Sequence, residues 1–198
     1  MQMQIFRRVV LGIMVLGLTL STLVILSCGG SDDDADETRL QANLSAANER
    51  QPPPPAPNPA GNGTAVLTIS DDEQTINYTL TYAAVNNVTQ AHIHVVNSPD
   101  QAGPIILFLC TNVGLGTNMP CAGAGPIPTP QPCPQGSVTI TGTLTAADLS
   151  CKAATATSPA VLSFADAIAQ LRAGNTYTNV HSTANPQGDI RGTDIFVD

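Results

Sequence analysis

Seven short segments rich in β-branched and aliphatic residues follow one another along the second part of the chain. Stretches rich in Gly, Pro, Asn and Asp separate them. Regularly spaced short strands with this punctuation are typical of a sandwich or a barrel. We therefore predict a single all-β domain, either a β-sandwich or a barrel. The expected strands cover residues 64–70, 76–85, 91–96, 104–110, 137–145, 176–182 and 189–197.

The segment SFADAIAQLRAGN interrupts the β pattern. Phe164, Ile168 and Leu171 recur at helical spacing. Ser163 is a suitable N-cap, and Gly174 is suited to the residue just after a helix. We expect one short amphipathic helix that closes one end of the β structure.

A long loop, residues 111–136, is rich in Gly and Pro. Unstructured loops of this length are uncommon in compact domains. Cys110, Cys121, Cys133 and Cys151 lie in or near it, and in an exported domain they most simply form two disulfides, with three connectivities open. Each bridge would contribute about 3 kcal/mol by restricting the unfolded chain. We therefore expect a disulfide-stapled loop.

The N-terminus has the pattern of an export signal. Arg7 and Arg8 precede the uncharged apolar run 9–26. The run ends in ILSC, which resembles a bacterial lipobox whose cysteine, Cys28, becomes lipidated. We expect a lipoprotein signal peptide over residues 1–27 and attachment through Cys28 to a membrane of the cell envelope, at the outer membrane or cell surface. An uncleaved membrane anchor is the alternative, and both place the rest of the chain outside the cytoplasm.

Residues 28–60 contain an acidic cluster followed by a proline-rich stretch. Such sequences bury little apolar surface, so we expect a disordered acidic and Pro-rich tether before a domain spanning residues 61–198. Loss of Arg7 and Arg8 with the signal leaves five of the seven basic residues against fifteen acidic ones. This balance excludes nucleic acid as a partner.

The chain has three histidines, and strand periodicity relates them. His92 and His94 share one face of a strand, opposite Ile93, because side chains alternate between faces. In YTNVH, His181 shares a face with Asn179. Since the aliphatic residues must face the core, we expect the imidazoles on the outer surface. If the two strands are neighbours, the three rings would converge outside the sheet under a loop.

Three neutral imidazoles suit copper or zinc and leave a fourth position open for water or a partner. The H-x-H pair also looks like the copper-ligand strand of copper–zinc superoxide dismutases. Those enzymes need more than three histidines, which excludes a dismutase. The alternative is that the histidines form hydrogen bonds across strands, or to Asp189 and loop backbone. Arg191 lies in a strand and needs a partner, for which an ion pair with Asp189 or Asp166 is favoured over anion binding.

Four blocks in a fixed order resemble the CHRD (chordin-type) domain over most of residues 62–197. They are AHIH leading into AGPIILFLC, then SVTITGTLTAADL, then FADAIAQLRAGNTYTNVHSTANPQGDIRG. The resemblance implies an extracytoplasmic all-β domain, with an Ig-like or superoxide-dismutase-like sandwich or barrel. It implies no enzymatic activity, because none is established for the family. Similarity to plainer members implies a Cys110–Cys133 bridge, which leaves Cys121–Cys151.

The family's two most regular motifs fall on the histidine-bearing segments. One contains His92 and His94. The other contains Asn179, His181, Gly188, Asp189, Ile190, Arg191 and Gly192. Asp189 stands where Glu is usual in the family, which would keep an acidic partner for a nearby base.

These observations favour a non-enzymatic binding module at the cell envelope. It would hold copper or zinc at His92, His94 and His181 and could engage an envelope or extracellular protein. One alternative is a metal-dependent redox or hydrolytic enzyme, and another is a structural or adhesive surface domain without a ligand. We assign no catalytic residue, because the sequence contains no nucleophile elbow, phosphate loop or H-E-x-x-H motif.

Overall fold

A computed structural model of the chain describes residues 38–50, 60–98 and 101–197. The signal peptide, Cys28 and the proline-rich stretch lie outside these residues. No helix of the described part is long and apolar enough to cross a membrane. The strands are β1 (Thr38–Ser45), β2 (Asn62–Ile69), β3 (Ile76–Ala83), β4 (Val88–Val95), β5 (Ile105–Thr111), β6 (Val138–Leu144), β7 (Thr176–Ser182), β8 (Ile190–Thr193) and β9 (Ile195–Phe196).

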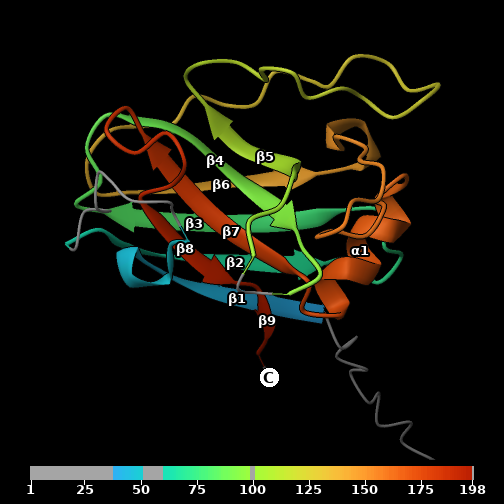
Figure 1. The fold of residues 1–198 in the computed structure, drawn as a ribbon, viewed down its shortest axis with the longest axis horizontal. Helices are drawn as coiled ribbons and strands as arrows, with labels where there is room; N and C mark the ends of the chain where they lie inside the picture. The colour runs from blue at the N-terminus through green and yellow to red at the C-terminus, as the bar shows by residue number, and fades with distance from the viewer. Residues whose placement is uncertain (1–37, 51–59, 99–100, 198) are drawn as a thin grey trace, which may run out of the picture. The chain divides into compact units, whose positions relative to one another are not determined.

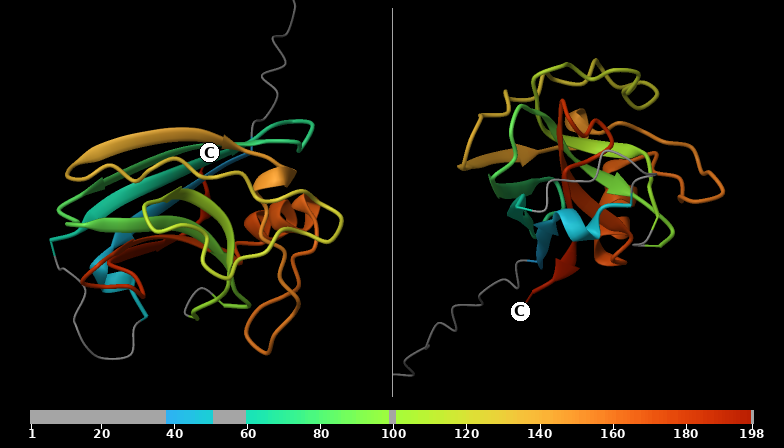
Figure 2. Two further views of the ribbon diagram at one scale, coloured as in Figure 1. Left: turned by 90° about the horizontal axis from the view of Figure 1, so that it is seen from above. Right: turned by 60° about the vertical axis from the view of Figure 1, so that its left-hand side comes forward.

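The strands form one antiparallel sheet in the order β5-β4-β7-β8-β1-β2-β3-β6, with β9 paired to β1 (Figure 1). Both views in Figure 2 show the sheet coiled on itself, with the yellow loop running along its outside. The sheet is a nearly closed barrel, which confirms the predicted all-β class. β4 and β7 are neighbours although more than eighty residues separate them in the sequence.

Strand β1 corrects the predicted domain boundary. Thr38–Ser45 lies within the expected disordered tether, yet it forms a strand paired with β2 along its whole length. Leu40, Ala42 and Leu44 alternate with polar residues and point into the core, where each is at most 2% exposed. The ordered domain therefore begins before residue 61. This period-two alternation was present in the sequence, but it lies between an acidic cluster and a proline-rich stretch.

The expected helix is present. Helix α1 spans Phe164–Arg172, and the Ser163 side chain accepts a hydrogen bond from the Asp166 backbone N–H at 3.1 Å. Gly174 follows the helix with φ +68°, a left-handed conformation that glycine adopts without strain. A short polar turn joins β2 and β3, which lie at two of the expected strand positions.

The last expected strand is divided in two at Asp194. Its carboxylate is fully buried and accepts a 2.8 Å hydrogen bond from the Thr178 hydroxyl. The chain changes direction at Asp194, where β8 ends. The following strand, β9, pairs with β1 and does not continue along β7. Burial raises the pKa of the Asp194 carboxyl to about 6.

The loop after β5 fills the seam between the edge strands β5 and β6. Gln131 accepts a backbone hydrogen bond from Thr111 at 2.9 Å, and its side chain donates to the Thr141 carbonyl, also at 2.9 Å. The Tyr78 hydroxyl donates to the Leu109 carbonyl at 2.7 Å and so reaches β5 from β3. The loop completes the barrel where backbone pairing between β5 and β6 is missing.

Two disulfides hold this loop and confirm the pairing that the family resemblance implied. They join Cys110 to Cys133 and Cys121 to Cys151. The first closes the loop onto the end of β5. The second fastens the loop to the segment that precedes α1.

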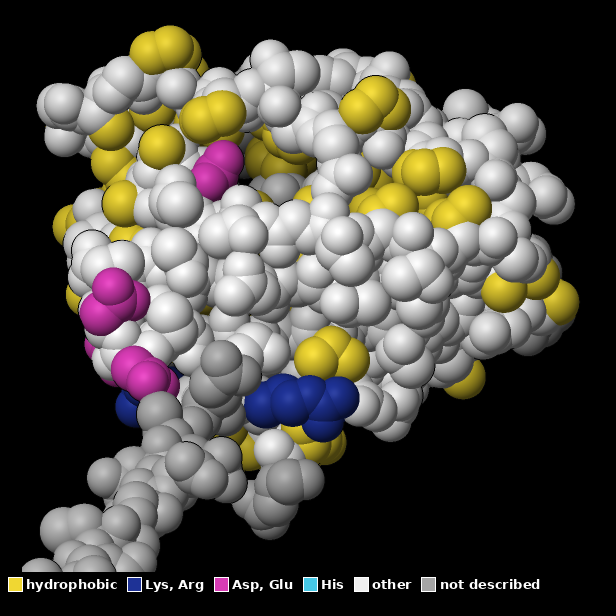
Figure 3. All heavy atoms as spheres, turned by 180° about the vertical axis from the view of Figure 1, so that it is seen from behind, with side chains coloured by type: hydrophobic (Ala, Val, Ile, Leu, Met, Phe, Trp, Pro, Cys, Tyr) yellow, Lys and Arg dark blue, Asp and Glu magenta, His cyan; other side chains and the backbone are white. Residues whose placement is uncertain are grey.

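The exterior has few charged groups, as expected for a chain with 11% charged residues. The face in Figure 3 shows mostly backbone and uncharged polar side chains, with scattered apolar ones and no histidine colour. The imidazoles are therefore not displayed on this side of the molecule.

Replacement of Leu40 by Ala tests whether β1 belongs to the folded domain. Removing a fully buried leucine side chain should lower the free energy of unfolding by about 2–5 kcal/mol. Asn43→Ala, at an exposed position of the same strand, should change it by less than about 0.5 kcal/mol. Urea unfolding of both variants measures the difference. Equal effects would contradict the placement of β1 in the core.

Candidate metal centre

The pairing of β4 with β7 brings the two histidine-bearing motifs together. His92 lies opposite Asn179, and the neighbouring pairs are Gln90 with His181 and His94 with Tyr177. Because side chains alternate, all of these residues project from the same face of the sheet. The expectation that the two strands are neighbours is confirmed.

The imidazoles lie outside the barrel under loops, as predicted, and this cover buries them almost completely. His92 is 1% exposed, His94 7% and His181 6%. The opposite face of β4 packs Ala91, Ile93 and Val95 in the barrel core, as the alternation predicts. The histidines do lie outside the barrel, but residues 102–105, 117–118 and 186–187 line the same pocket and cover them.

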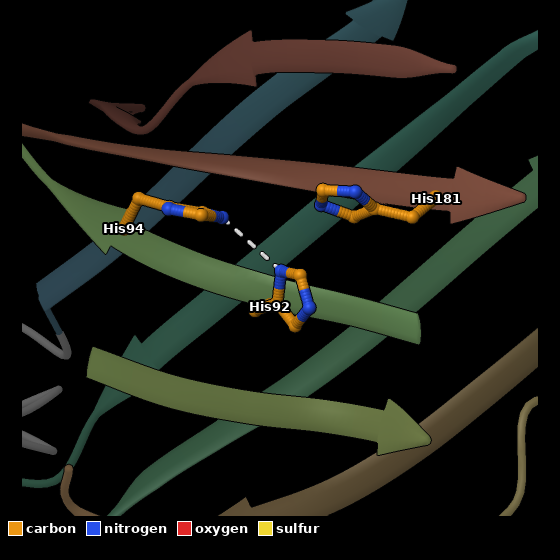
Figure 4. A group of neighbouring side chains, drawn as sticks. All are labelled: His92, His94 and His181. Carbon is orange, nitrogen blue, oxygen red and sulfur yellow. Dashed lines mark hydrogen bonds between the residues drawn. The ribbon is translucent and has the colours of Figure 1, made fainter. Parts of the chain in front are cut away.

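The three rings point toward one another (Figure 4). The ring centroids of His92 and His181 are 4.4 Å apart, and those of His92 and His94 are 5.1 Å apart. One nitrogen of each ring can be chosen so that all three lie within 4.8 Å of one another. The sequence prediction that the three imidazoles converge is confirmed.

The outer nitrogen of each ring faces an oxygen that can only accept a hydrogen bond. His94 Nδ1 lies 2.7 Å from the Gly103 carbonyl, and His181 Nδ1 lies 2.9 Å from the Pro186 carbonyl. His92 Nε2 lies 3.2 Å from the Gln90 side-chain oxygen. The Gln90 amide cannot present its nitrogen instead, because that nitrogen already donates to Gly114 and Thr111. All three outer nitrogens must therefore carry a proton.

The inner nitrogens consequently have lone pairs and no proton. A neutral imidazole has one N–H and one acceptor nitrogen. With the outer positions protonated, the acceptors are His92 Nδ1, His94 Nε2 and His181 Nε2. The first two are 3.1 Å apart, a hydrogen-bond distance with no proton left to occupy it. The centre of the cluster therefore suits a positively charged group.

A proton is a poor candidate for that group. Burial, the largest cause, lowers the pKa of His94 to about 3 and that of His181 to about 4. Burial and the neighbouring imidazoles hold the pKa of His92 well below its usual value. At neutral pH all three rings are therefore neutral, which is the form that binds metals.

Gly103 lets the covering segment approach β4 closely. A Cβ atom on this residue would lie 1.9 Å from the Val95 carbonyl oxygen. Without a side chain, the backbone comes near enough for the Gly103 carbonyl to accept from His94. The Gly103 N–H donates to the Tyr177 hydroxyl at 3.3 Å, which fixes the segment from its other side.

Asn179 and Asp189 lie beside the cluster. The atom placed 2.8 Å from His181 Nε2 is the Asn179 side-chain oxygen. Because the Pro186 carbonyl takes the ring's one proton on Nδ1, a matched bond needs the Asn179 amide turned over, with its N–H₂ group donating to Nε2. The Asp189 carboxylate accepts from the Asn185 amide at 2.6 Å, and its charge raises the pKa of His181 against the effect of burial. This electrostatic role agrees with the expected acidic partner for a base.

Arg191 lies in a strand, as predicted, and is buried beside the site. Its guanidinium carbon lies 3.4 Å from the centroid of Tyr177, whose ring stacks on His94 at 4.6 Å. The guanidinium also donates to the Gln101 carbonyl at 2.6 Å. Asp166, one expected ion-pair partner, instead accepts from the Leu162 backbone N–H at the start of α1.

Sequence reasoning missed the acceptors that orient the rings. Gln90 could have been found, since it shares the strand face of His92 in QAHIH. The backbone carbonyls of Gly103 and Pro186 could not have been found, because every residue has such a carbonyl and no side-chain pattern identifies it. Glu49, just after β1, was also missed. It lies near Arg191, and burial raises the pKa of its carboxyl to about 7.

The fold and the site define a small disulfide-bonded antiparallel β-barrel domain with a buried three-histidine cluster. The profile of the CHRD domain matches residues 40–193, so the chain belongs to the CHRD domain family. The match starts within β1 and ends at the last residue of β8. No curated protein and no solved structure matches the chain.

The depressed histidine pKa values predict acid sensitivity in the chelator-treated protein. The pKa of His94 is about 3 when folded, against 6.5 as its ordinary value. The contribution of neutral His94 to stability is fully present above pH 6.5. It is lost as the pH falls, because His94 takes up a proton in the unfolded chain but stays neutral in the folded protein. Between about pH 6 and 4 this contribution falls by about 1.4 kcal/mol per pH unit.

His94→Gln should remove this dependence. Urea unfolding across the pH range should show a correspondingly shallower fall in the variant than in the parent protein. The raised carboxyl pKa values of Glu49 and Asp194 act with the opposite sign, but both groups are present in each protein. Identical slopes would contradict neutral burial of His94.

Proposed function

We propose that this CHRD domain binds one copper or zinc ion through His92 Nδ1, His94 Nε2 and His181 Nε2. The supporting observation is that each outer ring nitrogen lies within hydrogen-bond distance of an oxygen acceptor, which leaves the inner nitrogens as the lone-pair side of each ring, within 4.8 Å of one another. Metal-binding histidines characteristically donate their second N–H to a carbonyl or carboxylate, which fixes the tautomer and the ring direction. The same pattern is present at each of these three rings.

The distances fit a metal after a small adjustment. Tetrahedral ligands at 2.0–2.1 Å from zinc lie about 3.4 Å apart. The His92 and His94 nitrogens, 3.1 Å apart, are already near that separation. The most distant pair, within 4.8 Å, closes by up to about 1.4 Å as the rings turn. His181 then exchanges the Asn179 amide for the metal.

The chemistry of the ligands favours copper or zinc over harder cations. Imidazole nitrogen suits copper and zinc, whereas magnesium and calcium prefer oxygen ligands. Three neutral ligands leave the charge of the ion uncompensated within the coordination shell. Asp189, whose charge already acts on His181, supplies a negative charge nearby.

The protein would act as a binding module held at the cell envelope. Two disulfides suit an oxidising compartment outside the cytoplasm. The basic-then-apolar N-terminus and Cys28 support export and lipid attachment. Attachment there would place the metal site beside the membrane, available to ions or to an envelope protein.

The metal proposal is tested by loading purified protein with copper or zinc and dialysing away free ion. Elemental analysis should find about one equivalent in the parent protein, and none in the His92→Ala/His94→Ala double variant or in His181→Ala. Gln187→Ala, at an exposed residue lining the same pocket, should retain the ion. Circular dichroism checks that each variant is folded.

Equal retention in the parent protein and in the folded double variant would show that the ion binds elsewhere. No retention in any of them would mean that the cluster is satisfied by hydrogen bonds instead. Either result contradicts the proposed site.

Lipid attachment is tested by Cys28→Ser expressed with its own leader. The parent protein should incorporate labelled fatty acid and sediment with membranes. The variant should lose the label, while Ser31→Ala, three residues on, should behave as the parent does. A parent protein that sediments with membranes but takes up no label would indicate an uncleaved apolar anchor instead.

A further inference from the structure

The pocket above the three histidines also contains a cationic side chain that the metal proposal does not use. The pocket has a volume of about 420 Å³ and opens to solvent. Its wall includes the three imidazoles together with Thr117, Asn118 and Lys152. A fourth metal ligand would therefore enter through this pocket and pass beside the Lys152 amine.

Neutral groups hold Lys152 in place. Its Nζ donates to the Asn118 side-chain oxygen at 2.7 Å, and the Asn118 amide nitrogen donates to the Leu115 carbonyl at 2.8 Å. These bonds fix which end of the amide faces the lysine. Within the described part of the chain, no carboxylate forms an ion pair with Lys152. Its charge is therefore not neutralised by the protein that surrounds it.

The second disulfide explains why Lys152 lies at this wall. Cys151 is its immediate neighbour and is bonded to Cys121, which follows the 117–120 segment of the stapled loop. On the other side, Lys152 and Val161 exchange two backbone hydrogen bonds of 2.8 Å. The Cys121–Cys151 disulfide thus links the segment that bears Lys152 to the segment that bears Asn118. Both segments border the pocket above the histidines.

We infer that the open metal position binds a small carboxylate, with one oxygen on the metal and the other accepting hydrogen bonds from Lys152. This inference rests on the proposed metal site and names its ligand. A divalent ion held by three neutral imidazoles keeps its full positive charge, and the Lys152 ammonium lies in the same pocket wall. The fourth ligand is therefore expected to be an anion and not a cation. A volume of about 420 Å³ suits a small organic acid rather than a polymer.

The inference is tested on copper-loaded protein with acetate and azide as probes. Azide bound to copper gives a charge-transfer absorption, and acetate should displace it. In Lys152→Met, both affinities should fall about tenfold or more, because a charge-assisted hydrogen bond is lost. Lys152→Arg should retain most of the affinity, and copper content should stay at about one equivalent in both variants.

The outcomes separate the two proposals. A parent protein that retains neither copper nor zinc overturns the metal site and this inference together. Copper retained without azide or acetate binding overturns the inference alone, as does equal affinity in the parent and Lys152→Met. Asn118→Ala, which frees the ammonium without removing it, should weaken binding less than Lys152→Met. A larger effect of Asn118→Ala would assign the anion contact to the loop instead.

Discussion

The antiparallel pairing of β4 with β7 is the interaction on which the site depends. It joins two segments that are distant in sequence and sets their register, so that His92 lies opposite Asn179. A slip of one residue would turn the side chains of one strand to the opposite face. That slip is opposed by the core, because Ile93 and Val180 are fully buried on the barrel side. Hydrophobic packing inside the barrel therefore positions the polar cluster outside it.

Burial gives the cluster its chemical character. Exposed histidines would bind water and titrate near neutral pH, but these rings are enclosed and their pKa values are lowered. The enclosing groups are mainly acceptors, which direct every N–H outward and every lone pair inward. Repulsion between the inner lone pairs is relieved when a cation binds there. In the proposed metal site, the burial that makes the unbound cluster costly would favour an ion at its centre.

Much of this arrangement could be predicted from sequence because it follows local rules. Alternation around Ile93 correctly placed the two histidines of β4 on one face, and capping residues located α1. The strand at Leu40 was missed because it lies between an acidic cluster and a proline-rich stretch. The sequence predicted that the imidazoles lie under a loop, but not that three separate loop segments would bury them almost completely. The approach of Gly103 to His94 depends on tertiary packing and not on any periodic pattern.

Anomalous diffraction from crystals of the copper- or zinc-loaded protein, recorded at the metal edge, tests the central claim most directly. The account predicts a single peak at bonding distance from His92 Nδ1, His94 Nε2 and His181 Nε2. The outer nitrogens should keep their contacts with Gln90, Gly103 and Pro186. A peak elsewhere on the protein, or a metal held by the outer nitrogens, would contradict it.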